Sequence, residues 1–230
     1  MDGDAPPFLR CRGVRVPDDP EVIKPRTRRL LRSGAYETKE ADAVRRLVKR
    51  GETVLEAGGG IGFMSSHLIR NCKAARVVSF EANPRMIPFI RRVHEATGVE
   101  GAEVRNALLS PEGGPPLPFY VREEFDASSL DPDRPANIPV TAVEDVPRAV
   151  LGEVFDEVRP DVLVCDIEGA EADLVPHMPL DGLRLAVLEL HPQWIGKAGV
   201  RAVFDAMAAA GLTYFPKASQ AKVVAFRRDW

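Results

Sequence analysis

The chain has 230 residues, with 31 lysines and arginines against 34 aspartates and glutamates, so its formal net charge is −3. At 45% hydrophobic and 28% charged residues, the composition is typical of a globular protein and excludes wholesale disorder, collagen and coiled coil. No apolar run approaches the roughly 18 residues of a membrane-spanning helix, and the start of the chain lacks the basic-then-apolar order of a signal peptide.

The three cysteines, Cys11, Cys72 and Cys165, are odd in number and far apart. This spacing predicts reduced thiols and a cytoplasmic location rather than a disulfide framework. The slightly acidic balance argues against nucleic acid as a partner. We therefore expect no membrane contact and no nucleic acid, and whether the chain forms a homo-oligomer stays open.

Residues 1–35 differ from the rest of the chain because they hold five prolines and a basic run from Lys24 to Arg32. Proline fixes φ and removes a hydrogen-bond donor, so we expect no long helix before about residue 26. We interpret 1–35 as an arm packed over the main domain, with a substrate lid or a dimer contact as alternatives. Residues 36–230 then form the main domain.

Between residues 39 and 110 the apolar spacing alternates between helical and strand-like segments. Pro88 is expected to delay or kink the helix that follows Asn83. The expected segments are a helix over 43–48, a strand over 53–57, a helix over 63–71, a strand over 77–80, a helix over 83–96 and a strand over 103–107.

Residues 111–140 are rich in proline and glycine and predict an insertion at the edge of the sheet, with a hairpin-like strand over 117–121. Further on we expect helices near 144–157 and from Val200 to Gly211, and strands over 161–166, 185–189, 212–215 and 223–226. Strands that alternate with helices imply βαβ units and a mostly parallel sheet with helices on both faces. The predicted class is therefore α/β, Rossmann-like and doubly wound, with seven strands.

A glycine-rich loop, Glu56-Ala57-Gly58-Gly59-Gly60-Ile61-Gly62, joins the first strand of this sheet to a helix. Glycine permits positive φ and close approach of a ligand, and such a loop lies at the carboxyl edge of the strands, where ligands bind. The dinucleotide fingerprint fits imperfectly, because its third glycine would fall on Ser65. Glu56 suits a cationic ligand better than a pyrophosphate.

The next strand ends in Glu81, 19 residues after Gly62. A carboxylate at this place can accept two hydrogen bonds from a ribose diol. Losing such charge-assisted hydrogen bonds costs about 1.5–3 kcal/mol.

An acidic segment, Asp166-Ile167-Glu168-Gly169-Ala170-Glu171, follows a buried strand. Together with four other segments it resembles the FkbM family of class I S-adenosylmethionine-dependent methyltransferases, which carries a D-x-E-G-x-E signature here. The resemblance covers roughly residues 36–192, although Glu56 stands where that family usually has aspartate. The other four segments are Glu81-Ala82-Asn83-Pro84, Asn106-Ala107-Leu108, Ser128-Ser129-Leu130 and Leu188-Glu189-Leu190-His191-Pro192.

The resemblance implies the class I methyltransferase fold, S-adenosylmethionine as cofactor, and O-methyl transfer to a hydroxyl of a small molecule such as a sugar, a polyketide or a lipid. It also implies that Tyr36-Glu37 closes over the cofactor. The residues that we expect at the cofactor are Glu56, Gly58, Gly60, Gly62, Glu81, Asn83, Asn106, Ala107 and Asp166.

We expect Asp166, Glu168 and His191 to be catalytic, because general bases for the acceptor's proton should sit at the strand ends beyond the glycine loop. Glu168 and Glu171 have an alternative role as caps of a helix that starts at Gly169. We predict no metal, but Asp166 and Glu189 are the candidate ligands if the reaction depends on magnesium or calcium.

Three other functions stay open. A nicotinamide-dependent oxidoreductase would share the glycine loop and Glu81 but would not explain the acidic segment. A binding module would keep the cofactor fold without activity. Methylation of an amino group, an RNA or a protein would use the basic run at 24–32 to contact phosphates.

Overall fold

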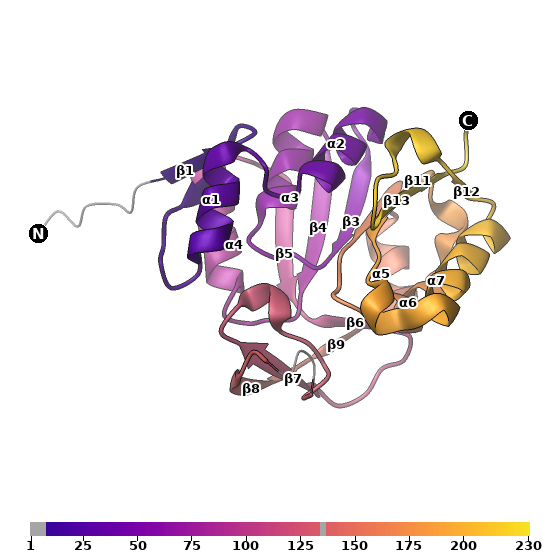
Figure 1. Ribbon diagram of the computed structural model, residues 1–230. Helices are drawn as coiled ribbons and strands as arrows, with labels where there is room; N and C mark the ends of the chain where they lie inside the picture. Colours follow the sequence, from indigo (N-terminus) through magenta and orange to yellow (C-terminus); the bar gives the residue numbers. More distant parts are fainter. Residues whose placement is uncertain (1–7, 134–136) are drawn as a thin grey trace, which may run out of the picture.

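The computed structural model describes residues 8–133 and 137–230. Within them, seven strands form a central sheet in the order β12-β13-β11-β10-β3-β4-β5 (Figure 1). The sheet is parallel except for β13, which runs antiparallel to both neighbours. This confirms the doubly wound, mostly parallel α/β sheet. The strands are β3 (Thr53–Ala57), β4 (Arg76–Glu81), β5 (Ala102–Asn106), β10 (Val162–Cys165), β11 (Leu185–Glu189), β12 (Thr213–Tyr214) and β13 (Val223–Arg227).

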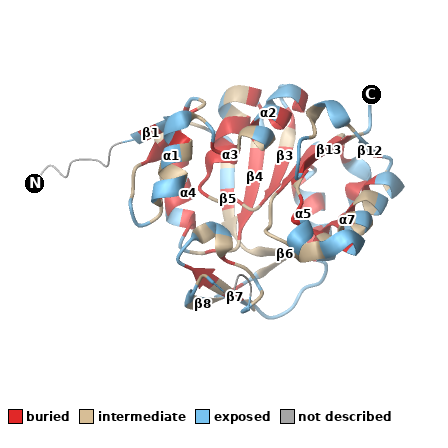
Figure 2. Ribbon diagram, viewed as in Figure 1, coloured by how far each residue is buried: buried red, intermediate tan, exposed pale blue. Residues whose placement is uncertain are grey.

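Helices cover both faces of the sheet because neighbouring strand residues point to opposite sides. Val54 and Val77 belong to a core shared with α1 to α4, whereas Leu55 and Val78 belong to a core shared with α5 to α7. Figure 2 shows buried residues along the central strands and a mixture of buried and exposed residues on the helices. The helices are α1 (Pro25–Ser33), α2 (Thr38–Leu47), α3 (Phe63–His67), α4 (Ile87–Thr97), α5 (Leu151–Val158), α6 (Glu171–Leu174) and α7 (Pro192–Ala209, with a non-helical residue at Gly196).

The order of the strands reverses between β3 and β10, which pair directly. In an open α/β sheet, ligands bind beyond the carboxyl ends of the strands at such a switch point. The glycine-rich loop follows β3 and the acidic segment follows β10. The fold therefore brings these two segments together.

Residues 8–33 form a hairpin, β1 (Phe8–Cys11) with β2 (Val14–Pro17), followed by α1, and residues 1–7 of the predicted arm lie outside the described residues. The apolar side chains of residues 8–33 are buried in the same core as those of α2, α3 and α4. The arm is thus packed into the main hydrophobic core over the described residues. Its buried members are Leu9, Cys11, Val14, Val16, Ile23 and Leu31.

The helix expected near 144–157 is wrong in its first half. Strand β8 (Val140–Val146) pairs with β7 (Leu117–Arg122) in a two-stranded sheet of its own, and β9 (Arg148–Val150) pairs with β6 (Leu108–Ser110). Helix α5 therefore begins only at Leu151. Residues 140–146 are extended because they pair with a strand that is distant in the chain. The apolar spacing within the segment carries no information about this partner.

The helix expected over 63–71 is α-helical only as far as His67 and continues as a π-helical turn (Leu68–Cys72). Five short elements complete the described chain: this turn, η1, and four 3₁₀ turns, which are η2 (Phe125–Ala127), η3 (Val175–His177), η4 (Leu180–Gly182) and η5 (Pro216–Ala218). In the described part of the chain, no helix combines the length and the hydropathy needed to cross a membrane. All three cysteines are buried and free.

Candidate active site

The glycines of the loop after β3 have two different surroundings. At Gly58, whose φ is +90°, an added Cβ would overlap the carbonyl oxygen of Asp166. At Gly62, whose φ is +75°, it would lie 2.9 Å from a side-chain carbon of Ile90. At Gly60, whose φ is +53°, it would meet nothing within 4 Å. Gly58 and Gly62 therefore allow close packing of the protein, whereas Gly60 faces open space.

Glu81, at the end of β4, reaches across to this loop. Its Oε2 accepts a hydrogen bond from the Gly60 N–H at 2.9 Å, and its Oε1 accepts one from the Asn83 N–H at 2.7 Å. An ionised carboxylate has about four acceptor sites, so both oxygens can still accept from a ligand. Burial raises the pKa of Glu81, whereas these backbone N–H groups lower it.

The two asparagines predicted at the cofactor support the backbone beside Glu81. Asn106 Nδ2 donates to the carbonyl oxygens of Glu81 and Ala82, at 2.9 and 3.0 Å. Asn83 Oδ1 accepts from the Arg85 N–H at 3.1 Å, which is a local turn contact. Ala107 packs against the core on the α5 side of the sheet.

Glu56 is buried inside the protein rather than exposed at the strand end. Its Oε2 accepts a hydrogen bond from the Ser79 hydroxyl, and its Oε1 has no hydrogen-bond partner among the described residues. Burial and the neighbouring Glu81 together raise the pKa of Glu56 to about 8, although the hydrogen bond from Ser79 opposes this shift. A buried carboxyl with an unpartnered oxygen favours a hydrogen-bond donor or a cation nearby.

The acidic segment after β10 forms a tight turn, not the start of a helix at Gly169. Glu168 and Gly169 both have positive φ, +50° and +103°, so helical geometry is excluded there and α6 begins at Glu171. The Glu171 side chain folds back, and its Oε1 accepts from the Gly169 N–H at 3.0 Å. The turn leaves about a third of the Asp166 and Glu168 side chains exposed.

His191, just after β11, lies against this turn and is buried. Its Nδ1 is 2.7 Å from Glu171 Oε1, its Nε2 is 3.1 Å from Glu168 Oε2, and Asp166 Oδ1 lies 3.9 Å from Nε2. The structure thus brings together all three predicted catalytic residues. Burial, together with Glu168 and Glu189, raises the pKa of Asp166.

Asp166, Glu189 and His191 each place one oxygen or nitrogen within 4.8 Å of the others, a spacing that a cation could bridge. However, the His191 Nε2 already faces Glu168, and Lys222 Nζ lies 3.9 Å from Glu189 Oε1. The ring nitrogen that a metal would need thus already has Glu168 as a partner, and we assign no metal to this cluster.

Two further acids, Glu37 and Asp126, influence the candidate site from elements outside the ends of the sheet strands. Glu37, at the start of α2, has a positive φ of 43°, and burial together with Glu40 raises its pKa to about 8, with Glu56 and Glu189 contributing. Asp126, on η2, has its pKa raised by burial and by Glu168. The sequence pair Tyr36-Glu37 had indicated a place near the cofactor for Glu37, whereas no pattern around Asp126 indicated its interaction with Glu168.

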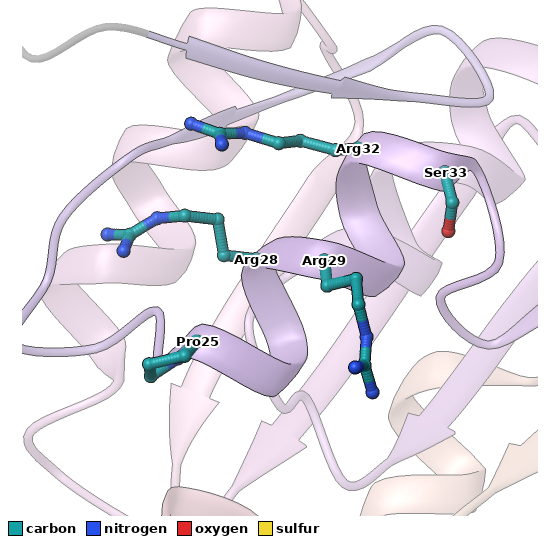
Figure 3. A pocket seen from close by; sticks show the side chains of 5 residues that line it. All are labelled: Pro25, Arg28, Arg29, Arg32 and Ser33. Atoms are coloured by element: carbon teal, nitrogen blue, oxygen red, sulfur yellow. The ribbon is translucent and has the colours of Figure 1, made fainter.

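A basic surface lies on α1. Arg28, Arg29 and Arg32 line a hollow there with Pro25 and Ser33 (Figure 3). Figure 3 shows that Arg28 and Arg32 extend to the same side of the helix, whereas Arg29 extends away from them. Asp18 pairs with the first two, 2.6 Å from Arg28 Nε and 3.4 Å from Arg32 Nη2. Nearby acid thus offsets part of this positive charge, and none of the candidate site residues lines the hollow.

No family model and no curated protein matches the sequence. Among solved structures, Trm5b from Pyrococcus abyssi is similar with a TM-score of 0.53 and 11% identity, over 98% of this chain and 56% of that one. A precorrin-6y C5,15-methyltransferase from Geobacter metallireducens (TM-score 0.48, 12% identity, 78% and 72% of the two chains) is also similar. A ribosomal protein L11 methylase from Lactobacillus delbrueckii subsp. bulgaricus is similar too, with a TM-score of 0.48 and 10% identity over 84% of this chain and 77% of that one. The chain has the Rossmann-like methyltransferase fold.

Proposed function

We propose that this protein is an S-adenosylmethionine-dependent methyltransferase of the FkbM family that transfers a methyl group to a hydroxyl of a small molecule. The observation that carries the proposal is the contact between Glu81 and the Gly60 N–H. It joins an acceptor for a ribose diol to the open position of the glycine loop, at the switch point of the sheet.

The residues around this contact fit S-adenosylmethionine. Glu81 accepts from the ribose hydroxyls, and Gly60 leaves room for the ligand beside the loop. The unpartnered oxygen of the buried Glu56 favours a ligand that brings a hydrogen-bond donor or a positive charge over a pyrophosphate. When bound, the cofactor supplies an electrophilic methyl group on a sulfonium.

On the acceptor side, Asp166 and Glu168 orient the hydroxyl and take up its proton. Asp166 suits this role because about a third of its side chain is exposed and because a raised pKa brings a carboxylate closer to the pKa of an efficient base. A positioned general base contributes typically about 10²–10⁴-fold to a rate.

The FkbM assignment is supported by where its segments lie. Four of the five follow the carboxyl ends of β4, β5, β10 and β11, and the fifth pairs with β7 through Ser129 and Tyr120. A small acceptor is favoured over RNA because Asp18 partly neutralises the basic helix α1.

Calorimetric titration with S-adenosylhomocysteine, with NAD and NADP in parallel, tests the proposal. We expect S-adenosylhomocysteine alone to bind, and Glu81→Ala to weaken it by roughly ten- to a hundredfold. Glu95→Ala, on the exposed face of α4, is the matched control and should bind as the wild type does. Binding of a nicotinamide cofactor, or of none of the three, would overturn the cofactor assignment.

A further inference from the structure

Both ring nitrogens of His191 lie against carboxylates. Nδ1 is 2.7 Å from Glu171 and Nε2 is 3.1 Å from Glu168. A neutral imidazole has one donor and one acceptor nitrogen, whereas an ionised carboxylate only accepts hydrogen bonds. Two ionised carboxylate partners are therefore both satisfied only when each nitrogen carries a proton, that is, when the ring is an imidazolium.

Glu171 is built to hold the ring in this state. Its side chain is 0% exposed, and its Oε1 also accepts from the Gly169 N–H, which closes the turn that carries Glu168. An added Cβ at Gly169 would lie 2.9 Å from the Cβ of Trp194 on α7. The turn after β10 and the start of α7 are thus packed tightly together, with the pair of Glu171 and His191 between them.

The surroundings of the ring are otherwise acidic. Asp166 lies 3.9 Å from Nε2 and leaves Oδ1 without a partner. Glu189, at the end of β11, and Glu37, from the start of α2, both act on the pKa of Asp166. The Lys222 Nζ lies 3.9 Å from Glu189 Oε1. A positive His191 therefore balances the charge of a site that is rich in acids.

We propose that Glu171 is a positioning residue that keeps His191 doubly protonated, with its Nε2–H directed at Glu168 and towards Asp166. His191 then orders these two carboxylates and does not act as the base. The proton that the acceptor hydroxyl releases goes to a carboxylate oxygen of Asp166, whose side chain is about a third exposed. The catalytic consequence rests on the proposed function, whereas the protonation state of His191 does not.

Other buried histidines provide an internal contrast. Burial lowers the pKa of His67 and of His94 to about 4. Burial alone would also lower the pKa of His191, but its hydrogen bonds to Glu168 and Glu171 outweigh that effect and raise it to about 10. At pH 8 the His191 ring should therefore be charged, whereas the rings of His67 and His94 should be neutral.

A long-range ¹H–¹⁵N spectrum of the histidine-labelled full-length protein at pH 8 tests the inference. We expect one imidazole with both nitrogens in the protonated range and the absence of that signal in His191→Gln. Glu171→Gln should move the pKa of His191 from about 10 towards the ordinary value of 6.5, so that its ring is neutral at pH 8. A neutral His191 in the wild type would overturn the inference.

Because Glu171 is fully buried, its variant can fail to fold, so Glu168→Gln serves as a second variant on a partly exposed side chain. It should also lower the pKa of His191 while circular dichroism stays native. Glu153→Gln, at an exposed position of α5, should leave the His191 signal unchanged. An unchanged signal in Glu168→Gln would contradict the inference.

A parallel titration with S-adenosylhomocysteine separates the two proposals. If the wild type fails to bind it while His191 is doubly protonated, the proposed function fails and the assignment of the Glu171–His191 pair stands. If it binds while His191 is neutral at pH 8, the assignment of the pair fails alone.

Discussion

At the scale of single residues, Gly58 and Gly60 are two residues apart and have opposite environments. A Cβ at Gly58 would overlap the backbone of Asp166, whereas one at Gly60 would meet open space. Both have positive φ, which costs a non-glycine residue on the order of 1 kcal/mol. We therefore expect Gly58→Ala to unfold the protein or lower its melting temperature sharply.

Gly60→Ala is the matched variant. It should keep most of the stability but lose affinity for S-adenosylhomocysteine, because its methyl group enters the space assigned to the ligand. Thermal melting and calorimetry on both variants check the pair. Equal loss of stability in the two would contradict the distinction between a packing glycine and a ligand-facing one.

Because His94 is buried in its neutral form, it makes the folded state less stable as the pH falls. Its Nε2 lies 2.9 Å from the Ser65 hydroxyl, and its pKa falls from 6.5 in the unfolded chain to about 4 in the folded protein. Above pH 6.5 the His94 ring is neutral in both the folded and the unfolded chain, so it makes no pH-dependent contribution to the free energy of unfolding. Between about 6.5 and 4 the unfolded chain binds the proton, so stability falls as the pH falls, by up to about 3 kcal/mol.

His94→Gln should remove part of this loss, as measured by urea unfolding at pH 7 and pH 5. The wild type must be measured in parallel because Glu56 changes the free energy of unfolding with pH in the opposite direction to His94. The pKa of Glu56 is raised from 4.5 to about 8, so its contribution to stability is lost as the pH rises between these values. An identical pH dependence in the variant and the wild type would argue against a neutral, buried His94.

The residues that were predictable are those with a local signal. Glycine spacing and strand ends located Gly60, Glu81 and Asp166, because the carboxyl ends of parallel strands meet at one edge. The contacts of Asp126 and of Glu171 were not predictable, because they depend on how η2 and the tight turn at Glu168 fold back. Positive φ at Glu168 has no sequence signature comparable to that of a glycine.

At the scale of elements, helix α1 belongs to the hydrophobic core and is not a detachable cover. Leu31 is fully buried in the core shared with α2, α3 and α4. Leu31→Ala should lower the free energy of unfolding by about 2–4 kcal/mol. Arg29→Ala, on an exposed position of the same helix, should change it by less than about 0.5 kcal/mol. Chemical denaturation compares them, and a neutral Leu31→Ala would favour a mobile lid.

The structure confirms the predicted elements in which a single segment carries its own sequence pattern. The strand β10 and the strand β11 as far as Leu188 are continuous apolar runs, as expected for parallel strands covered on both faces. The apolar runs of β3 and β4 are interrupted by Glu56 and Ser79. The helix prediction was wrong for residues 140–146 because these residues are only slightly buried, in an alternating pattern. Their strand partner also lies about 20 residues earlier in the chain.

At the scale of the whole molecule, the two hairpins should differ in stability. The buried side chains of β1 and β2 belong to the main core, whereas Phe119, Val121 and Val146 of β7 and β8 form a small cluster of their own. Local opening costs less where few buried contacts are lost. Hydrogen exchange of the β7–β8 amides should therefore be at least about tenfold faster than that of the β1–β2 amides. Equal protection of the two would contradict this.

The position of β13 also bears on how the protein is made. The ribosome delivers the chain from its N-terminal end, and every acid of the candidate site lies before β13, the last strand of the sheet in chain order. Until residues 223–227 emerge, β11 has no neighbour on that side, and an open strand edge invites pairing with other chains. A product that stops near residue 212 would therefore carry all these acids and still be prone to aggregate.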